Sequence, residues 1–324
     1  MADEPRLWAL ADLFTPMALR VAATLRLADH IAAGTGTVGA LAERTGADAD
    51  ALGRLLNHLV AAGALARDEA GTLSLTALGD ELRDAAAWLD IEGAIGRADL
   101  SAFHLLETVR SSEPAYPLAH GRGYWEDLAA HPELSASFDA LMRARLRTEA
   151  PLVAAAYDWG ALAHVVDVGG GDGTLLAAVL AAHPGVRGTL VELAGPAAAA
   201  ARTLAEFGER RVIVTGSFFE PLPAGADGYV LSGVLHDWDD EHALAILRRC
   251  AEAAGACGRV LVIEEGPTDA AIRAEGDLRM LLYTGGRERS LGDFETLAAD
   301  AGLRVGSTRL VTGVRTLIEL LRET

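Results

Sequence analysis

Residues 164–174 read HVVDVGGGDGT, an apolar β-branched run followed at once by a cluster of glycines. Val165, Val166 and Val168 suit an interior parallel strand, and the glycines after them allow a ligand to approach the backbone closely. Residues 174–182 then consist mostly of good helix formers. A strand, a glycine turn and a helix in this order predict the nucleotide-binding edge of an α/β sheet.

The spacing of these glycines argues against a nicotinamide dinucleotide. A G-x-G-x-x-G fingerprint would need glycine at position 174, where Thr174 stands. The next strand, 188–192, ends in Glu192, which lies 23 positions after Gly169. An acid at this place accepts hydrogen bonds from ribose hydroxyls. Glu192 alone fits an ordinary strand-end carboxylate as well, but the glycine turn beside it favours a nucleoside ligand.

Composition narrows the class of protein. The chain has 324 residues, of which 51% are hydrophobic, and a formal net charge of -18. This charge repels nucleic acid and anionic membranes, so we expect neither as a partner. The chain has no long uncharged apolar run, carries charges in residues 1–10, and has only two cysteines. These features predict a cytoplasmic protein. Lysine is absent, which excludes Schiff-base chemistry.

Residues 1–110 have the apolar periodicity of helices. Within them, residues 37–76 indicate two helices separated by a turn at Gly46 and then a hairpin around Gly71, which is a winged-helix pattern. Winged helices often bind DNA, but residues 35–84 hold eight acids and four arginines. We therefore expect this domain to pack against another subunit.

Residues 111–162 continue the helical pattern and are predicted to form a helical linker that contributes to a substrate pocket. The aromatic residues within residues 85–150 fit either a helical core, which these residues alone favour, or the lid of an aromatic pocket. They are Phe103, His104, Tyr116, Tyr124, Trp125 and Phe138.

Strands and helices alternate over residues 163–324, which predicts an α/β fold with a doubly wound parallel sheet. The last two strand patterns, 303–311 and 314–321, are separated only by Thr312 and Gly313, so they predict a hairpin that adds an antiparallel strand at one edge. The expected parallel strands are 164–168, 188–192, 211–215, 228–232 and 258–264.

Residues 229–241 read YVLSGVLHDWDDE, a strand that ends in His236 before acids open the next helix. Open α/β sheets place chemistry at the carboxyl ends of strands, and an imidazole with a reference pKa of about 6.5 accepts protons near neutral pH. Glu264, at a strand end, and Glu288, in a loop, are candidates to orient it. The alternatives are a helix-capping or solvent-facing histidine and two solvated acids. His242 is expected at the surface.

Four motifs occur in the order VVDVGGGDG, GSFFEPLP, VLHDWDDE and GGRERS. With the helical half before them, the chain resembles, over essentially its whole length, the S-adenosylmethionine-dependent O-methyltransferases of the plant caffeic acid type and of bacterial secondary metabolism. The resemblance implies a winged-helix dimerisation domain, a C-terminal seven-stranded Rossmann-like methyltransferase domain and a homodimer. It also implies S-adenosylmethionine as the cofactor, S-adenosylhomocysteine as its product, and no metal.

The resemblance implies roles for individual residues. His236 matches the family's general base, with Glu264 and Glu288 as the acids that position it. The implied cofactor residues, running from the methionine end through the ribose to the adenine, are Asp167, Gly169, Gly170, Gly171, Glu192, Phe218 and Trp238. The residues implied on the side of the aromatic acceptor are Phe138, Met142, Asp237 and Met280.

Two cofactor-side positions depart from the family pattern. Ser217 stands where the family commonly has an acid, and Ser232 where it has a basic residue. A hydroxyl still donates and accepts hydrogen bonds, so we expect binding with altered contacts. Some relatives bind the cofactor without methylating and use the pocket for hydroxylation or rearrangement. Such an enzyme is one alternative function, and a winged-helix regulator that senses a ligand is another.

Methylation of a phenolic or related aromatic hydroxyl fits the expected base best. A phenol has a pKa of about 10 and is mostly protonated at neutral pH, so a base within hydrogen-bond distance makes it a better nucleophile. The acceptor itself is not determined by these residues, because phenols, aryl carboxylates and polyketide rings all fit the pattern.

Overall fold

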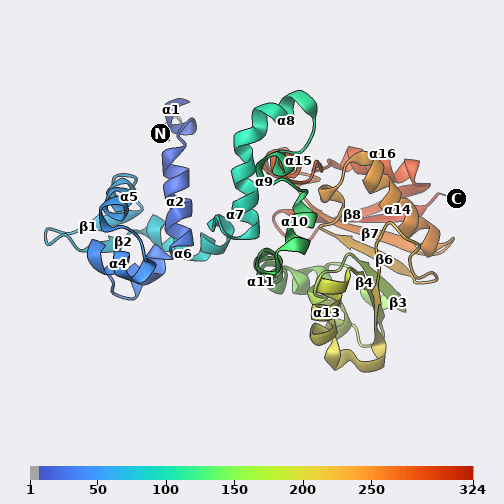
Figure 1. Ribbon diagram of the computed structural model, residues 1–324. Coiled ribbons are helices and arrows are strands. Elements are labelled where there is room, and N and C mark those ends of the chain that lie inside the picture. The colour runs from blue at the N-terminus through green and yellow to red at the C-terminus, as the bar shows by residue number, and fades with distance from the viewer. Residues whose placement is uncertain (1–6, 324) are drawn as a thin grey trace. The chain divides into compact units, whose positions relative to one another are not determined.

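The computed structural model describes residues 7–323 and divides into two compact units (Figure 1). The first unit comprises residues 7–100 and 128–138, and the second comprises 101–127 and 139–323. These limits differ from the domain boundaries predicted at residues 110 and 162, which stay predictions. No helix within the described residues combines the length and apolarity needed to cross a membrane.

The first unit is helical and carries the predicted winged-helix arrangement. In it α4 (Val38–Thr45) and α5 (Ala49–Ala61) precede β1 (Leu65–Arg67) and β2 (Leu73–Leu75), which pair antiparallel. Thr37 and Asp48 begin the two helices by accepting backbone N–H groups three residues on, and Gly46, with φ of +69°, ends α4. The other helices are α1 (Leu7–Leu10), α2 (Phe14–Thr24), α3 (Leu27–Ala32), α6 (Ala77–Leu89) and α7 (Ala94–Asp99).

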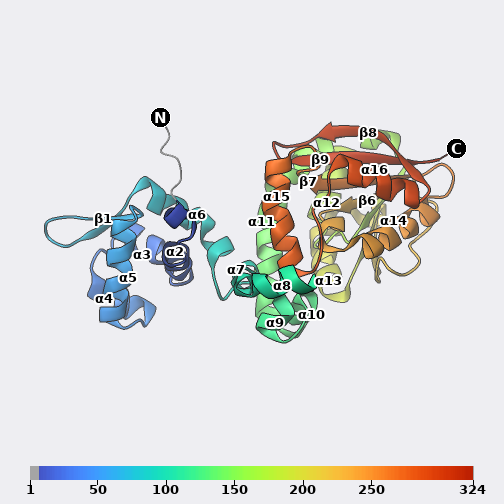
Figure 2. The ribbon, with the colours of Figure 1, turned by 90° about the horizontal axis from the view of Figure 1, so that it is seen from above.

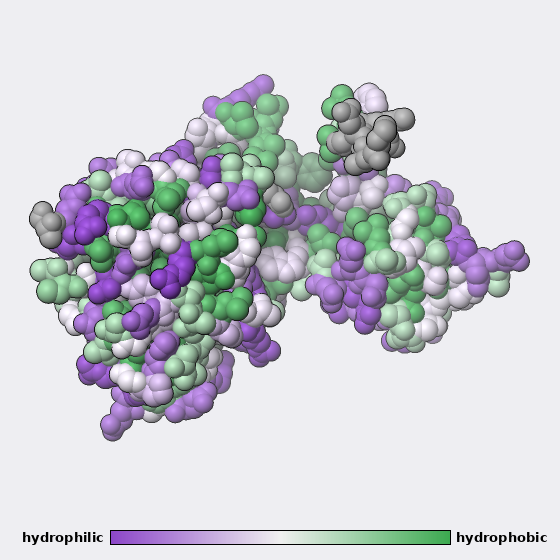
Figure 3. Space-filling model, turned by 180° about the vertical axis from the view of Figure 1, so that it is seen from behind, coloured by the Kyte–Doolittle hydropathy of each residue, from purple (hydrophilic) through white to green (hydrophobic). Residues whose placement is uncertain are grey.

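Large apolar side chains remain uncovered on α1 and at the beginning of α2. Figure 3 shows several green, hydrophobic residues at the surface next to the part of the chain drawn in grey. Exposed apolar patches on a folded unit commonly mark an interaction surface. These side chains, which are between 63% and 84% exposed, belong to Leu7, Trp8, Leu10, Leu13 and Phe14.

The second unit is built on a seven-stranded sheet of order β5-β4-β3-β6-β7-β9-β8. The first five strands in this order are parallel, and β9 pairs antiparallel with both β7 and β8. The predicted α/β class, seven strands and terminal hairpin are therefore confirmed. The expected antiparallel strand at the edge is wrong in its position, because the antiparallel strand β9 lies inside the sheet and β8 is the edge strand. The strands are β3 (His164–Val168), β4 (Arg187–Glu192), β5 (Arg211–Thr215), β6 (Gly228–Ser232), β7 (Arg259–Glu265), β8 (Leu303–Leu310) and β9 (Arg315–Arg322).

Helices cover both faces of this sheet. On one face α14 (Asp240–Ala254) and α16 (Leu291–Asp300) pack on Val166, Leu231 and Val262; Figure 2 shows the two helices side by side. The opposite face carries α12 (Thr174–Ala182) and the end of α11 (Pro132–Ala156). Further helices and 3-10 turns are η1 (Leu100–His104), α8 (Leu105–Ser111), α9 (Tyr116–His120), α10 (Tyr124–Ala130), η2 (Trp159–Ala161), α13 (Ala194–Thr203), η3 (Ala205–Arg210), η4 (Leu235–Asp237) and α15 (Ala270–Tyr283).

The direction of strand addition reverses at β3. From β3 the chain adds β4 and β5 on one side, and it then crosses to add β6 and β7 on the other. The carboxyl ends of β3 and β6 are consequently neighbours at the switch point, where open α/β sheets bind ligands. The glycine turn follows β3 and the turn with His236 follows β6, so the fold brings the two predicted motifs to one edge.

Part of the aromatic set forms helical core. Tyr116 and Tyr124 are buried with their rings edge to face at 5.2 Å, and Tyr124 stacks on Tyr283 of α15 at 6.0 Å. Phe103 is 64% exposed and lies outside that core. The buried tyrosines agree with the interpretation that the sequence favoured, at least for this part of the set.

We expect Trp159→Ala to lower the free energy of unfolding by about 3–5 kcal/mol, as removal of a buried aromatic side chain generally does. Trp159 is fully buried, and its indole N–H donates to the carbonyl of Val153 at 3.0 Å. Leu310→Ala is the control, because Leu310 is 61% exposed, and its effect should stay within about 0.5 kcal/mol. Chemical denaturation measures both. Equal losses for the two variants would contradict this account of the core.

Candidate active site

The glycine turn after β3 is shaped by the close approach of its backbone to a side chain. Gly169 has φ of +70° and donates its N–H to the carbonyl of Val191. A Cβ on Gly170 would lie 2.5 Å from the carboxyl group of Asp167. Only glycine at position 170 therefore lets the turn fold over the aspartate, which explains why this residue type stands there.

Asp167 is buried beneath this turn with a carboxylate that the protein leaves open. It is 1% exposed, and among the described residues neither oxygen has a hydrogen-bond partner. Burial, with a smaller contribution from the charge of Glu192, raises the pKa of Asp167 to about 7. Buried polar groups in native proteins are hydrogen-bonded, so these two oxygens are positioned for donors of a ligand.

Glu192, at the end of β4, faces the same turn. Its carboxylate accepts the N–H of Gly171 at 3.1 Å and that of Leu193 at 2.6 Å, while burial raises its pKa. On the other side of the turn, a Cβ on Gly169 would lie 3.4 Å from the ring of Phe218. That ring meets Trp238 edge to face, with centroids 5.8 Å apart. The turn thus lies between an acid and an aromatic wall.

The two serines that depart from the family pattern already have protein partners. Ser217 accepts the N–H of Phe219 at 3.2 Å, and Ser232 accepts a guanidinium N–H of Arg315 at the same distance. Each oxygen keeps further hydrogen-bonding capacity. Contact of either serine with a cofactor stays a prediction.

His236 lies in η4 among three carboxylates. Its Nδ1 is 3.3 Å from Glu264 Oε2 and 3.3 Å from Glu288 Oε1, and its Nε2 is 3.5 Å from Asp237 Oδ1. Burial lowers the pKa of His236, but the three negative charges outweigh it and raise the pKa to about 10. Glu264 is 2% and Glu288 8% exposed, so the alternative of two solvated acids is wrong.

The position of Glu264 follows from two backbone hydrogen bonds. Its Oε1 accepts the N–H groups of Val234 at 3.1 Å and Leu235 at 2.9 Å, which begin the turn that carries His236. Oε2 is thereby directed at the imidazole. Burial raises the pKa of this carboxyl group, and the two amides supply part of the stabilisation that a buried carboxylate needs.

Glu288 reaches His236 because two glycines leave room around it. A Cβ on Gly276 of α15 would lie 3.0 Å from Glu288 Oε1, and a Cβ on Gly286 would lie 2.1 Å from the carbonyl oxygen of His236. The backbone N–H of Glu288 donates to Asp277 at 2.9 Å. Sequence reasoning missed both glycines; the glycine pair that opens GGRERS was a signal for Gly286, and Gly276, inside a helix, had none.

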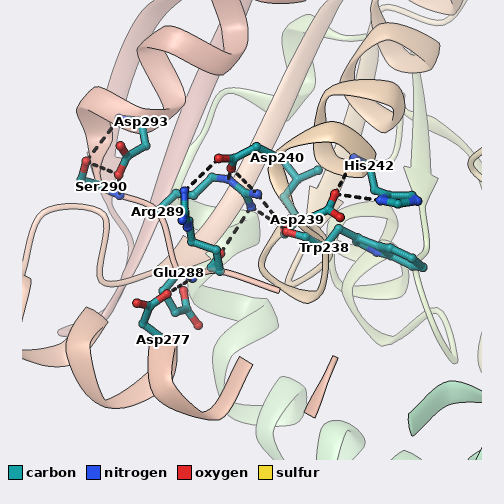
Figure 4. Close-up of polar contacts among 11 residues, drawn as sticks. Trp238, Asp239, Asp240, His242, Asp277, Glu288, Arg289, Ser290 and Asp293 are labelled. Carbon is teal, nitrogen blue, oxygen red and sulfur yellow. Dashed lines mark hydrogen bonds and ion pairs between the residues drawn. The ribbon is translucent and has the colours of Figure 1, made fainter. Parts of the chain in front are cut away.

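A second residue of that motif was also missed. Arg289 is buried and donates to the carbonyl groups of Leu235 and Trp238 and to Asp240 (Figure 4). Its only signal in the sequence was its place in the motif GGRERS, directly after the candidate acid Glu288.

Of the four residues expected on the side of the acceptor, one lies against His236. Asp237 lies against His236, and burial raises its pKa to about 7. Met142 on α11 and Met280 on α15 are half-buried, and Phe138 belongs to the other compact unit. The role of all four in binding an acceptor stays a prediction. Within residues 7–323, no three His, Cys, Asp or Glu side chains are grouped as a metal site requires.

Comparison with known proteins gives the same two parts. A family model described as an O-methyltransferase domain matches residues 103–304, and one described as an O-methyltransferase dimerisation domain matches residues 8–83. The chain is 55% identical over 313 residues to a 2,7-dihydroxy-5-methyl-1-naphthoate 7-O-methyltransferase of Streptomyces carzinostaticus, covering 94% of each chain.

Two further similarities bear on function. An O-methyltransferase from neocarzinostatin biosynthesis, solved with S-adenosyl-L-homocysteine and 1,4-dihydroxy-2-naphthoic acid, superposes with a TM-score of 0.95 at 52% identity, covering 99% of this chain and 100% of that one. An aclacinomycin 10-hydroxylase of Streptomyces purpurascens is 48% identical over 316 residues, covering 93% of this chain and 84% of its own.

We expect Glu264→Gln to lower the pKa of His236 from about 10 toward the reference value of about 6.5. Glutamine keeps an oxygen for the two amide donors but removes one of the two negative charges that lie 3.3 Å from Nδ1. Titration of ring-labelled histidine by NMR measures the change. Asp239→Asn is the control, because Asp239 contacts the exposed His242 instead. An unshifted titration in Glu264→Gln would exclude Glu264 as the main cause.

Proposed function

The chain belongs to the O-methyltransferase family, and on that premise we propose that Asp167 and Glu192 hold S-adenosylmethionine and that His236 deprotonates the acceptor. The protein is an S-adenosylmethionine-dependent O-methyltransferase that acts on an aromatic hydroxyl. The observation that carries the residue assignment is a half-buried histidine, flanked by two buried carboxylates, across the switch point from the glycine turn.

The glycine turn fits the proposed cofactor. The open oxygens of Asp167 suit the ammonium group of its methionine end, and the cradle at Gly170 keeps the backbone close. Glu192 at the second strand end suits the ribose hydroxyls, and Phe218 with Trp238 offers a surface for the adenine. When bound, the cofactor supplies a methyl group on a positively charged sulfur for in-line displacement.

The proton of the acceptor hydroxyl passes to His236. Nδ1 lies between Glu264 and Glu288, so we assign Nε2 to the acceptor. The two glutamates stabilise the imidazolium that forms and hold the ring in one orientation. Because its pKa is raised to about 10, His236 carries a proton at neutral pH in the free protein, and it acts as the base only in the form that has lost this proton. The fraction of His236 in this deprotonated form rises with pH up to the pKa of about 10, so proton transfer from the acceptor should speed up with pH over that range.

The acceptor that we propose is a hydroxyl on a fused aromatic ring. The support is a naphthoate O-methyltransferase at 55% identity and a solved relative holding a dihydroxynaphthoic acid. Met142 and Met280 are apolar side chains suited to a flat ring, and the position of Asp237 beside Nε2 supports a contact with its hydroxyl.

We also propose that two copies associate through residues 1–110. A dimerisation-domain model matches residues 8–83, and the uncovered side chains of α1 and α2 provide an apolar face for it. The regulator alternative finds no support in the family, and the acidic winged helix disfavours DNA.

Hydroxylation is the second candidate, because an aclacinomycin 10-hydroxylase is 48% identical. The two reactions differ in products. A methyl transfer yields one S-adenosylhomocysteine for each methylated acceptor, whereas a hydroxylation leaves the donor methyl group in place. Quantifying both products in one assay with a hydroxynaphthoate decides between them.

We expect His236→Ala to reduce methyl transfer by about 10²- to 10⁴-fold, the range that a general base contributes. Transfer of labelled methyl to a panel of hydroxynaphthoates measures it. His242→Ala is the matched control, since His242 is half-exposed and bonded to Asp239, and it should retain wild-type activity. Full activity in His236→Ala would remove the proposed base.

We expect the affinity for S-adenosylhomocysteine to fall as pH drops below about 7. Asp167, with a pKa raised to about 7, must lose a proton to pair with the ligand's ammonium group, and protonation at lower pH opposes this. Calorimetry between pH 5.5 and 8.5 measures the affinity and the proton released. Asp167→Asn should bind more weakly and without that pH dependence, whereas Glu192→Gln should keep it. A flat wild-type profile would contradict the assignment.

A further inference from the structure

Arg289 is the one arginine among the largest fully buried side chains of the described residues. A guanidinium group carries five N–H donors and keeps its charge at any physiological pH, so burial is costly unless these donors are used. The proposed mechanism uses Glu288 next to it and assigns nothing to Arg289. Its contacts therefore require a separate explanation.

The guanidinium group holds both ends of the turn that carries His236. Nη1 donates to the carbonyl of Leu235 at 2.7 Å, and Nη2 donates to the carbonyl of Trp238 at 2.8 Å. These two residues precede and follow the His236–Asp237 pair. Figure 4 shows the fork of Arg289 extending between Trp238 and Asp240. A single rigid plane thus fixes the bend on which the histidine lies.

Asp240 orients that plane. Its Oδ1 accepts Nε at 3.0 Å and Nη2 at 2.8 Å, while its Oδ2 accepts the exposed Arg287 at 2.9 Å. The loop that carries Arg289 has a second bond to the turn that carries His236, because the backbone N–H of Arg287 donates to the carbonyl of His236 at 2.8 Å. Glu288 lies between these two attachments, so its distance to His236 depends on both.

We propose that Arg289 is a positioning residue that sets the geometry between His236 and Glu288. It donates hydrogen bonds to the backbone on both sides of His236 and belongs to the same loop as Glu288. Lysine has a point charge and no planar fork, so it cannot hold two carbonyls and a carboxylate in this arrangement. The inference rests on the proposed role of His236 as base.

Arg289→Lys tests this directly, with Arg287→Ala as the matched control. Arg287 pairs with the same carboxylate from outside and is 59% exposed. We expect Arg289→Lys to lower kcat by about 10- to 100-fold, as small misplacements of reacting groups do, with KM for both substrates changed by less than about threefold. The NMR titration of His236 should move to lower pH. Arg287→Ala should leave all of these unchanged.

A merely structural role would lower the melting temperature of Arg289→Lys while kcat and the His236 titration stayed at wild-type values, and that result would overturn the proposal. If Arg289→Lys does not fold, Asp240→Ala tests the proposal instead. Asp240 is exposed, and its replacement removes two of the hydrogen bonds that orient Arg289. It should shift the titration in the same direction by a smaller amount, and no shift would overturn the proposal. Full activity of His236→Ala would instead refute the base, and the titration would still report on positioning.

Discussion

The two carboxylate oxygens of Glu264 make different contacts, one with the backbone and one with His236, and the rest of the active site depends on both. Oε1 ties the beginning of the turn after β6 to the end of β7, and Oε2 is left to face the imidazole of His236. Without its amide donors the buried carboxylate would be unstable as an anion. Without the carboxylate, burial would favour a neutral histidine. The strand ends, the turn and the charge on the ring are thus coupled through one side chain.

Glycines, which have no side chain, shape this site as much as charged groups do. Gly170 admits the turn above Asp167, Gly276 makes room for the carboxylate of Glu288, and Gly286 lets its loop approach the backbone of His236. A Cβ would collide with the carboxyl group of Asp167 at Gly170 and with a main-chain oxygen at Gly286, and at Gly276 it would crowd the carboxylate of Glu288. A binding edge and a base are therefore built into a domain whose helices and strands pack otherwise as an ordinary α/β sandwich.

Sequence reasoning located the strands and the histidine at a strand end because hydrophobic periodicity and strand order follow from local pattern. It identified Glu264 and Glu288 only as candidates, since whether a charge near a strand end turns inward is decided by distant residues. Arg289 escaped notice because its main partners are backbone carbonyls some 50 positions away and backbone atoms leave no mark in a sequence. Gly276 and Gly286 were missed for the same reason.

The placement of β9 between β7 and β8 has a consequence for the order in which this protein acquires structure. A ribosome delivers β7 and β8 before β9, yet these two strands meet only through β9. Until residue 322 has been made, β7 ends the growing parallel sheet as a bare edge, and bare edges invite pairing with other chains. The sheet can therefore be completed only after residue 322 has been synthesised, although domains generally form from the N-terminus onward.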